Sequence, residues 1–263
     1  MNLKEKYGEW GVILGATEGV GKAFCEKLAE GGMNVVMVGR REEKLKALGE
    51  EIKAKYGVEY KVVRADFSEE NAAETVFAAT EGLDMGFMSY VACLHSFGKI
   101  QDTPWEKHQA MINVNVVTFM KCFYHYMKIF TAQNRGAVIN VSSMTGISSS
   151  PWNGQYGAGK AYILKMTEAV ACECENTNVD VMCITLGTTL TPSLLSNIPG
   201  GPAGERVMAA AQTPEAVVEE AFEKLGKELS VITGDHNKKS VHDWKANHTE
   251  DEYIRYMGSF YQE

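Results

Sequence analysis

The chain has 263 residues, of which 45 % are hydrophobic and 23 % charged, with 25 glycines but only 6 prolines. These proportions are close to globular averages and exclude disordered, coiled-coil and collagen-like chains. The 34 acidic residues outnumber the 26 basic ones, so the formal net charge is −8. Broad binding of nucleic acid or of an anionic membrane surface needs excess positive charge, and neither is expected here.

The cysteines and the N-terminus bear on cellular location. No stretch reaches the roughly 18 apolar residues of a membrane span, and residues 1–6 lack the apolar core of a signal peptide. The only close cysteine pair, Cys172 and Cys174, has no second pair or spaced histidines to complete a metal site. We therefore expect no metal, no membrane anchor and a cytoplasmic location, with buried, reduced thiols at positions 25, 93, 122, 172, 174 and 183.

Short apolar runs rich in β-branched residues recur along the chain and predict strands. They cover residues 12–14, 35–38, 60–63, 87–92, 137–141, 179–184 and 229–232. Several are continuously apolar, as expected for parallel strands that helices cover on both faces. Helical stripes separate them, for example Val20, Phe24 and Leu28. The alternation predicts one doubly wound α/β domain over residues 1–234, with a seven-stranded parallel sheet.

Capping signals mark the starts of three later helices. Thr103-Pro104-Trp105-Glu106 places a capping Thr before a Pro at the first helical position and a Glu at the third. Thr213-Pro214 repeats the first two signals, and Thr249-Glu250-Asp251-Glu252 reads as a capping box.

Two segments near the C-terminus are apolar without belonging to the predicted sheet. Residues 190–212 are rich in Leu, Ile, Met, Gly and Pro, a composition that suits a mobile substrate lid. Residues 235–263 predict a C-terminal helical extension with Trp244 and a stripe of Tyr253, Met257 and Phe260 or Tyr261. This extension either packs on its own domain or borders the site of a second subunit, and we favour a dimer contact.

A glycine-rich turn follows the first predicted strand and precedes a helix. Its sequence is Gly-Ala-Thr-Glu-Gly-Val-Gly over residues 15–21. The glycines let backbone N–H groups approach a ligand, and the helix dipole favours negative charge, so the turn predicts a pyrophosphate site. The spacing differs from the commoner G-x-G-x-x-G, and a turn without a ligand is the alternative.

The end of the second predicted strand indicates which cofactor binds. An NAD site usually carries Asp or Glu about 20 residues after the glycines. Here Arg40 and Arg41 stand after Gly39, and two guanidinium groups are suited to hold a 2′-phosphate. The alternative is that both arginines only begin a charged, solvated helix. We favour NADP.

Three residues later in the chain predict proton transfer to or from a substrate. Tyr156 and Lys160 are four residues apart and project from one helix face. A nearby ammonium group lowers the pKa of a phenol from its usual value near 10, so that the phenol can exchange a proton with an alcohol or ketone. Ser143 ends the fifth predicted strand and can donate to the substrate oxygen.

The motif Gly15-xxx-Gly19-x-Gly21 with Ser143, Tyr156 and Lys160 resembles the short-chain dehydrogenase/reductase family over about residues 8–234. The resemblance implies a Rossmann-type fold and a homo-oligomer. By resemblance, Tyr156 is the general acid/base, Lys160 lowers its pKa and holds the nicotinamide ribose, and Ser143 and Tyr156 bind the substrate oxygen. Asn115 matches the family's helix Asn that holds a water in the proton relay, and its register is preferred over that of Asn113.

The same resemblance implies a set of cofactor contacts, in which Asp66 faces the adenine and Thr189 and Thr191 are candidates for the carboxamide. The expected contacts are Gly15, Thr17, Glu18, Gly19, Val20, Gly21, Arg40, Arg41, Asp66, Phe67, Ala92, Asn115, Tyr156, Lys160, Thr189 and Thr191. The chain also departs from the family. Tyr90-Val91-Ala92-Cys93 replaces the usual Asn-Asn-Ala-Gly, and Leu186 replaces a Pro.

Within the family, residues 15–24, 83–103, 142–160 and 241–261 resemble the NADP-dependent 7β-hydroxysteroid dehydrogenases of gut bacteria. This resemblance implies a small-molecule steroid substrate and interconversion of 7-keto and 7β-hydroxy bile acids. Met144, Ile147, Pro151 and Trp152 are candidates for a substrate wall, and His95 is expected to be structural. The alternatives are reduction of a 3-oxoacyl thioester or another steroid ketone, and a non-catalytic NADP-binding sensor.

Overall fold

Seven parallel strands form one sheet in the computed structural model, which describes residues 2–196 and 201–259. The strands are β1 (Trp10–Leu14), β2 (Asn34–Gly39), β3 (Tyr60–Arg64), β4 (Met85–Tyr90), β5 (Gly136–Ser143), β6 (Val179–Leu186) and β7 (Ser230–Ile232). Their order is β3-β2-β1-β4-β5-β6-β7. The predicted doubly wound sheet is therefore confirmed, and the strand order reverses direction between β1 and β4. The carboxyl ends of strands at such a point form the crevice where cofactors bind.

Helices cover the sheet on both sides and connect its strands. They are α1 (Leu3–Tyr7), α2 (Gly19–Glu30), α3 (Glu42–Tyr56), α4 (Ala72–Thr80), α5 (Trp105–Ile112), α6 (Phe119–Gln133), α7 (Gly154–Glu173), α8 (Pro192–Leu195), α9 (Gly201–Ala210) and α10 (Pro214–Lys224). Shorter 3₁₀ turns are η1 (Ile100–Asp102) and η3 (Met144–Gly146), and the π-helical segment η2 (Asn113–Thr118) joins α5 to α6.

Successive residues of β1 supply both hydrophobic cores. Ile13 belongs to a core with Phe24 of α2 and Phe222 of α10, whereas Leu14 belongs to a second core with Phe123 of α6. All four strand positions from Gly11 to Leu14 are buried. The continuous apolar pattern is thus explained by a strand that is covered on both faces.

Of the two predicted threonine caps before a proline, one is confirmed and one is wrong. Thr213 caps α10 as predicted, because its hydroxyl accepts from Ala216 N at 3.1 Å. The prediction for Thr103 is wrong: its hydroxyl donates to the Lys99 carbonyl at 3.2 Å, and α5 begins after Pro104 without a side-chain cap. The Thr side chain closes its own preceding turn instead of the helix that follows.

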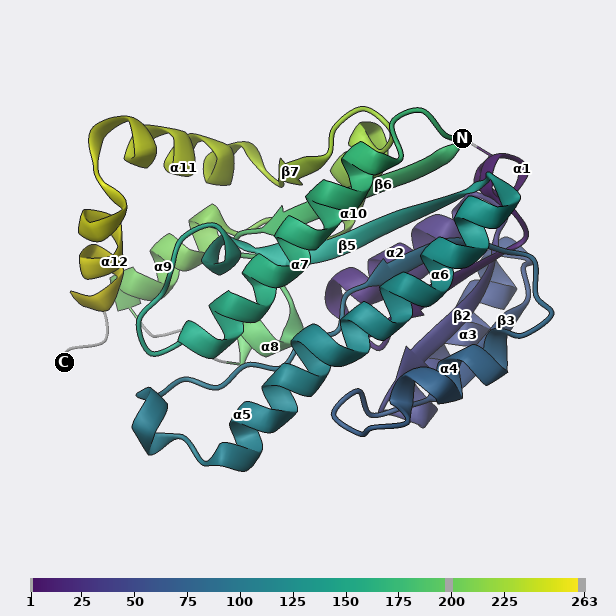
Figure 1. Cartoon of the computed structure of the whole chain (residues 1–263), viewed down its shortest axis with the longest axis horizontal. Coiled ribbons are helices and arrows are strands. Elements are labelled where there is room, and N and C mark those ends of the chain that lie inside the picture. The colour runs from purple at the N-terminus through teal and green to yellow at the C-terminus, as the bar shows by residue number, and fades with distance from the viewer. Residues whose placement is uncertain (1, 197–200, 260–263) are drawn as a thin grey trace.

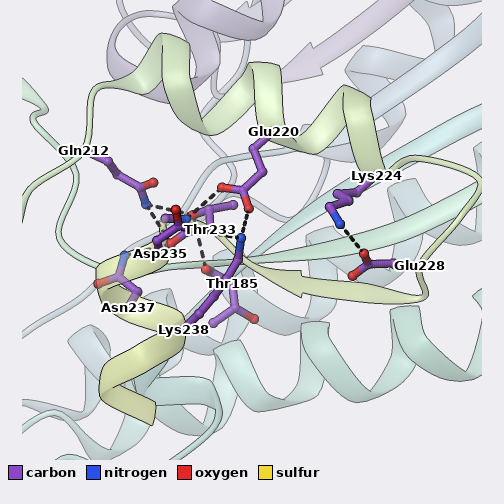
Figure 2. A network of polar contacts seen from close by, with 10 residues as sticks. Thr185, Gln212, Glu220, Lys224, Glu228, Thr233, Asp235, Asn237 and Lys238 are labelled. Atoms are coloured by element: carbon purple, nitrogen blue, oxygen red, sulfur yellow. Dashed lines mark hydrogen bonds and ion pairs between the residues drawn. The ribbon is translucent and has the colours of Figure 1, made fainter. Parts of the chain in front are cut away.

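The C-terminal extension consists of α11 (Asp235–Asn247) and α12 (Glu250–Ser259), the yellow-green helices at one end of Figure 1. Its start is joined to the domain by polar contacts that Figure 2 shows. Lys238 binds Glu220 of α10, the Gly234 amide donates to the same carboxylate at 2.8 Å, and Asn237 Nδ2 donates to the Thr233 carbonyl at 2.8 Å. The extension therefore begins as a fixed part of the domain.

The far end of the extension packs on its own domain. The predicted capping box is confirmed, since Glu252 accepts from the Thr249 amide at 2.7 Å and Thr249 Oγ1 accepts from the Glu252 amide at 3.3 Å. Ser148 donates to Glu250, and a Cβ on Gly258 would lie 3.3 Å from Pro151 Cγ. The stripe positions Phe260 and Tyr261 lie outside the described residues.

The predicted lid is partly helical. Its described parts are α8 and α9, with residues 197–200 outside the description. Thr191 caps α8, because its hydroxyl accepts from Leu194 N at 3.3 Å. Within residues 2–196 and 201–259, no helix combines the length and apolarity needed to cross a membrane.

The thiols are only partly buried, which corrects the sequence interpretation. Cys25, Cys122, Cys174 and Cys183 are buried, but Cys93 and Cys172 are exposed, and all six are free. Burial raises the pKa of Cys183 from its ordinary value of 9.0 to about 12, and burial likewise raises the pKa of Cys25 and Cys122.

These three buried thiols predict loss of stability in alkali. As pH rises, these thiols lose their protons in the unfolded chain before they do so in the folded chain. Their ionisation therefore leaves the free energy of unfolding unchanged below about pH 8 and lowers it at higher pH. Each buried thiol lowers the free energy of unfolding by about 1.4 kcal/mol for every pH unit above about pH 9. The three thiols together lower it by about 4 kcal/mol per pH unit. Urea unfolding between pH 7.5 and 10.5 measures this slope.

A pair of cysteine variants provides the control for that slope. Cys122→Ala removes one of the buried thiols and is expected to reduce the alkaline fall by about 1.4 kcal/mol per pH unit. Cys172→Ala, at an exposed position, is expected to leave the fall unchanged. A free energy of unfolding that stays constant up to pH 10.5 in the parent chain would contradict the prediction.

Candidate active site

The glycine-rich turn lies where the carboxyl end of β1 meets the N-terminus of α2. Gly15 has a φ of +103°, and a Cβ there would lie 2.6 Å from the Ala92 nitrogen. A Cβ on Gly21 would lie 2.0 Å from the Gly15 carbonyl oxygen. Both positions therefore require glycine. The N-cap residue Glu18 makes no side-chain hydrogen bond to this turn, which leaves the first N–H groups and the helix dipole to a pyrophosphate.

Arg40 and Arg41 lie beside this turn. Arg41 Nη2 is 2.9 Å from Glu18 Oε2, and Arg40 Nη1 is 3.9 Å from Asp66 Oδ2. Both arginines therefore bend back toward the cofactor crevice. A Cβ on Gly39 would lie 2.8 Å from Thr17 Oγ1, so Gly39 leaves room for that hydroxyl. A hydroxyl and two guanidinium groups are the donors that a phosphate needs.

The end of β3 contributes one carboxylate to the same corner. Burial alone would raise the pKa of Asp66, but hydrogen bonds from the Ser68 amide at 3.0 Å and hydroxyl at 2.8 Å, with the nearby arginines, hold it below its ordinary value. Asp66 is therefore a fixed anion. The Phe67 ring is buried against Tyr90, which leaves only the Phe67 backbone for the expected cofactor contact.

Tyr156 and Lys160 lie one turn apart on α7, and Ser143 ends β5 next to them. Ser143 lies close enough to the Tyr156 phenol to lower its pKa, and the Ser143 hydroxyl accepts from the Thr145 hydroxyl at 3.1 Å. Lys160 is only 1 % exposed, its Nζ donates to the Val141 carbonyl at 2.7 Å, and it lies 5.8 Å from the centroid of the Tyr156 ring. The structure thus brings the three residues predicted to be catalytic together at the carboxyl end of β5.

The pKa of Tyr156 is set mainly by burial. Burial raises this pKa above its ordinary value of 10.0, Cys93 raises it further, and the nearby Ser143 hydroxyl opposes the rise. The predicted lowering by Lys160 is not seen in this arrangement, because Lys160 Nζ is directed to the Val141 carbonyl and burial lowers its own pKa. A raised pKa keeps the phenol protonated at neutral pH, which is the form that can donate to a ketone.

Asn115 holds the loop that faces Tyr156. It is 1 % exposed, its Oδ1 accepts from the Leu94 amide at 3.1 Å, and its Nδ2 donates to the Leu94 carbonyl at 2.7 Å. Asn113 instead donates to the Ser68 carbonyl. Asn115, whose register the sequence favours over that of Asn113, is therefore the one that faces the site. Since both side-chain groups bind Leu94, the predicted contact with a relay water stays a prediction.

The sequence reasoning missed two residues on this loop. Cys93 lies close enough to Tyr156 to raise the pKa of its phenol, and the His95 ring stands edge-on to the Tyr156 ring with 5.8 Å between the ring centroids. His95 is exposed, which differs from the interpretation of a packed structural histidine. Cys93 occupies the position where the family usually has Gly, and that departure was the only available signal.

Removing the Cys93 thiol is expected to change the pH dependence of the reaction. Cys93 raises the pKa of Tyr156, so Cys93→Ala lowers that pKa. Alcohol oxidation requires the phenolate, and its alkaline rise in kcat/KM should therefore move to lower pH. The pH profile of alcohol oxidation measures the shift, with exposed Cys172→Ala as the control. A profile of Cys93→Ala that moves upward, or not at all, would contradict the prediction.

The remaining expected cofactor contacts surround the turn. A Cβ on Gly19 would lie 2.8 Å from Thr191 Cγ2, which places Thr191 directly against the turn. Thr189 is buried and its hydroxyl donates to the Gly187 carbonyl at 3.2 Å. The Val20 side chain is buried in the core, so its backbone amide is the part left for a phosphate. These placements leave both threonines as predicted contacts.

The geometry fits a nicotinamide dinucleotide, since Gly15, Gly19 and Gly21 form a turn whose close contacts leave no space for side chains. The glycines and the start of α2 would hold the pyrophosphate, and Arg40 and Arg41 the adenosine end. Among residues 2–196 and 201–259, no three His, Cys, Asp or Glu side chains gather as metal ligands.

The chain is similar to known proteins over its whole length. A family model described as short chain dehydrogenase matches residues 9–198. A 7β-hydroxysteroid dehydrogenase of Collinsella aerofaciens is 84 % identical over 263 residues, which is 100 % of both chains. Another, of Clostridium sardiniense, is 45 % identical over 246 residues, or 94 % of this chain and 93 % of that protein. A solved structure from work on 7β-hydroxysteroid dehydrogenase stereoselectivity has a TM-score of 0.96 at 85 % identity, covering 98 % of this chain and 100 % of the other.

Proposed function

This chain belongs to the short-chain dehydrogenase family, and from that premise we propose that it interconverts 7-keto and 7β-hydroxy bile acids with NADP(H). The observation that carries the proposal is the 84 % identity, from end to end, with a 7β-hydroxysteroid dehydrogenase. The grouping of Ser143, Tyr156 and Lys160 supports catalysis over a binding role, because a sensor has no need of an acid/base pair beside a cofactor turn.

In ketone reduction, the residues of this chain supply orientation and a proton. The bound nicotinamide supplies the hydride. Ser143 donates a hydrogen bond to the carbonyl oxygen, which places that oxygen next to the Tyr156 phenol. Tyr156 then gives its proton to the oxygen as negative charge develops there. Lys160 Nζ donates to the Val141 carbonyl in this structure. In the proposed mechanism its ammonium group stabilises the phenolate that forms after the proton has left, and the reverse sequence oxidises the alcohol.

The preference for NADP over NAD is part of the proposal. The arginine corner at the end of β2 supports it: Arg40 and Arg41 lie within ion-pair distance of the carboxylates of Asp66 and Glu18. In a chain with a net charge of −8, a 2′-phosphate depends on such local donors, because the general field is negative.

The proposal is tested by incubating the chain with NADPH and 7-oxolithocholate and identifying the epimer formed. The expected product is ursodeoxycholate, the 7β alcohol. A panel with a 3-oxoacyl thioester and other steroid ketones distinguishes the alternatives. A clear preference for the thioester, or formation of the 7α epimer, would overturn the bile-acid assignment while leaving the family membership intact.

We further propose that the chain acts in the cytoplasm as a homo-oligomer, with a dimer favoured. The free thiols support a reducing compartment. Tyr256 of α12 stacks on Trp244 of α11 and is 48 % exposed, while α12 also packs on the 148–152 loop. An exposed aromatic surface of this kind can form a contact with a second subunit.

Deletion of residues 241–263 is expected to weaken that dimer. Light scattering should show fewer truncated chains per assembly than for the full-length chain. Steady-state kinetics should show a raised KM for the steroid, because the extension also contacts the 148–152 loop near the site. Tyr256→Ala in the full-length chain is a milder test of the same surface. A truncated chain with unchanged mass and kinetics would remove this role.

A further inference from the structure

A cavity of about 420 Å³ lies between the loop after β4 and the loop before α7. Its lining includes Phe97, Lys99, Asp102, Lys107 and Trp152. The Gly98 amide donates to the Trp152 carbonyl at 2.9 Å, so the two loops are fixed to one another across the cavity. A volume of this size is within the usual range for small-molecule sites.

Aromatic rings connect this cavity to the reacting centre. The centroids of the Tyr156 and His95 rings are 5.8 Å apart, and those of the His95 and Phe97 rings are 5.6 Å apart. Phe97 is 56 % exposed, although a side chain of this kind is usually buried. A ligand whose carbonyl lies at Tyr156 therefore has an apolar surface leading from the catalytic phenol to the cavity.

The backbone of the cavity wall is held in a costly conformation. Trp152 has a φ of +60°, a left-handed geometry that bulky residues rarely adopt. It is kept in place by the Gly98 hydrogen bond and by α12, since a Cβ on Gly258 would lie 3.6 Å from Trp152 Cζ3. Strain of this kind is found mainly where the surrounding structure imposes it for a ligand site.

The charges that line the cavity are positive on balance. Lys99 and Lys107 contribute two ammonium groups and Asp102 one carboxylate. Many lysines elsewhere on this acidic surface pair with carboxylates, as Lys53 does with Glu59, while others such as Lys61 bind a backbone carbonyl. None of the ion pairs between described residues involves Lys99, Lys107 or Asp102. An apolar entrance followed by two cations complements a ligand with an apolar body and an anionic end.

From this arrangement we infer that the cavity binds the carboxylate-bearing side chain of the steroid substrate, with Lys99 and Lys107 as the residues that recognise the acid. This inference rests on the proposed function, because a bile acid joins an apolar ring system to a terminal carboxylate. Phe97 and Trp152 contact the apolar part of the side chain. Asp102 opposes the anion and limits its affinity.

The test compares an acid with its neutral methyl ester. In the Lys99→Gln, Lys107→Gln double variant, KM for 7-oxolithocholate is expected to rise about three- to tenfold with kcat within twofold, as for loss of two exposed ion pairs. KM for the methyl ester is expected to stay constant. Asp102→Asn should lower KM for the acid, and added salt should raise KM for the acid in the parent chain only.

Lys61→Gln on β3, away from the cavity lining, is the control for an overall change of charge. Equal effects of the double variant on acid and ester, or no effect on either, would overturn the inference. If the parent chain reduces neither compound, the proposed function fails. Equilibrium binding of acid and ester, followed by tryptophan fluorescence, then still tests the subsite, because only the affinity for the acid should depend on the lysines.

Discussion

Replacement of Tyr156 with phenylalanine is expected to lower kcat for ketone reduction by about 10²- to 10⁴-fold, the usual contribution of a positioned general acid. The ring and its contact with His95 stay in place, and only the phenolic hydroxyl next to Ser143 is lost. Single-turnover oxidation of NADPH in the presence of a 7-keto bile acid measures the effect on the chemical step.

The matched control is Tyr162→Phe. Tyr162 lies on the same helix and packs edge-on against Phe119, away from Ser143, so this variant is expected to keep its activity. NADPH binding should be retained in both variants, because the glycine-rich turn and the arginine corner are untouched. Full turnover by the Tyr156→Phe protein would refute the assignment of the general acid.

The sheet could be predicted because its signals are local. Seven apolar runs gave seven strands, and their continuity indicated burial on both faces, as in β1. The ends were less certain because hydrogen bonds, not composition, terminate a strand. The strand expected over 87–92 stops at Tyr90, since the amides of Val91 and Ala92 both turn to the Leu14 carbonyl.

The grouping of Ser143, Tyr156 and Lys160 could also be predicted, because their spacing alone places them on one helix face and one strand end. The loop after β4 could not. Its conformation depends on Asn115, 21 residues further along, whose amide group holds the Leu94 backbone. That long-range contact brings Cys93 and His95 to the Tyr156 ring. The pKa of Tyr156 therefore depends on burial and on a thiol that no local pattern identifies.

Replacement of both Arg40 and Arg41 with alanine is expected to raise KM for NADPH by about 10- to 100-fold while changing KM for NADH less than about threefold. A charge-assisted hydrogen bond contributes about 1.5–3 kcal/mol, so one such bond accounts for the range. The second arginine adds less, because in this structure Arg41 already pairs with Glu18 and exchanges that partner for the phosphate.

The control variant removes the same charge from the adjoining helix α3 without touching the end of β2. Lys46→Ala with Lys53→Ala on α3 takes away two cations that pair with neighbouring glutamates. It should leave the ratio of KM for NADH to KM for NADPH unchanged, because general electrostatics at this distance are screened by salt. If the arginine variant keeps the parent's preference for NADPH, the phosphate is held elsewhere, and the two arginines are only the solvated start of α3.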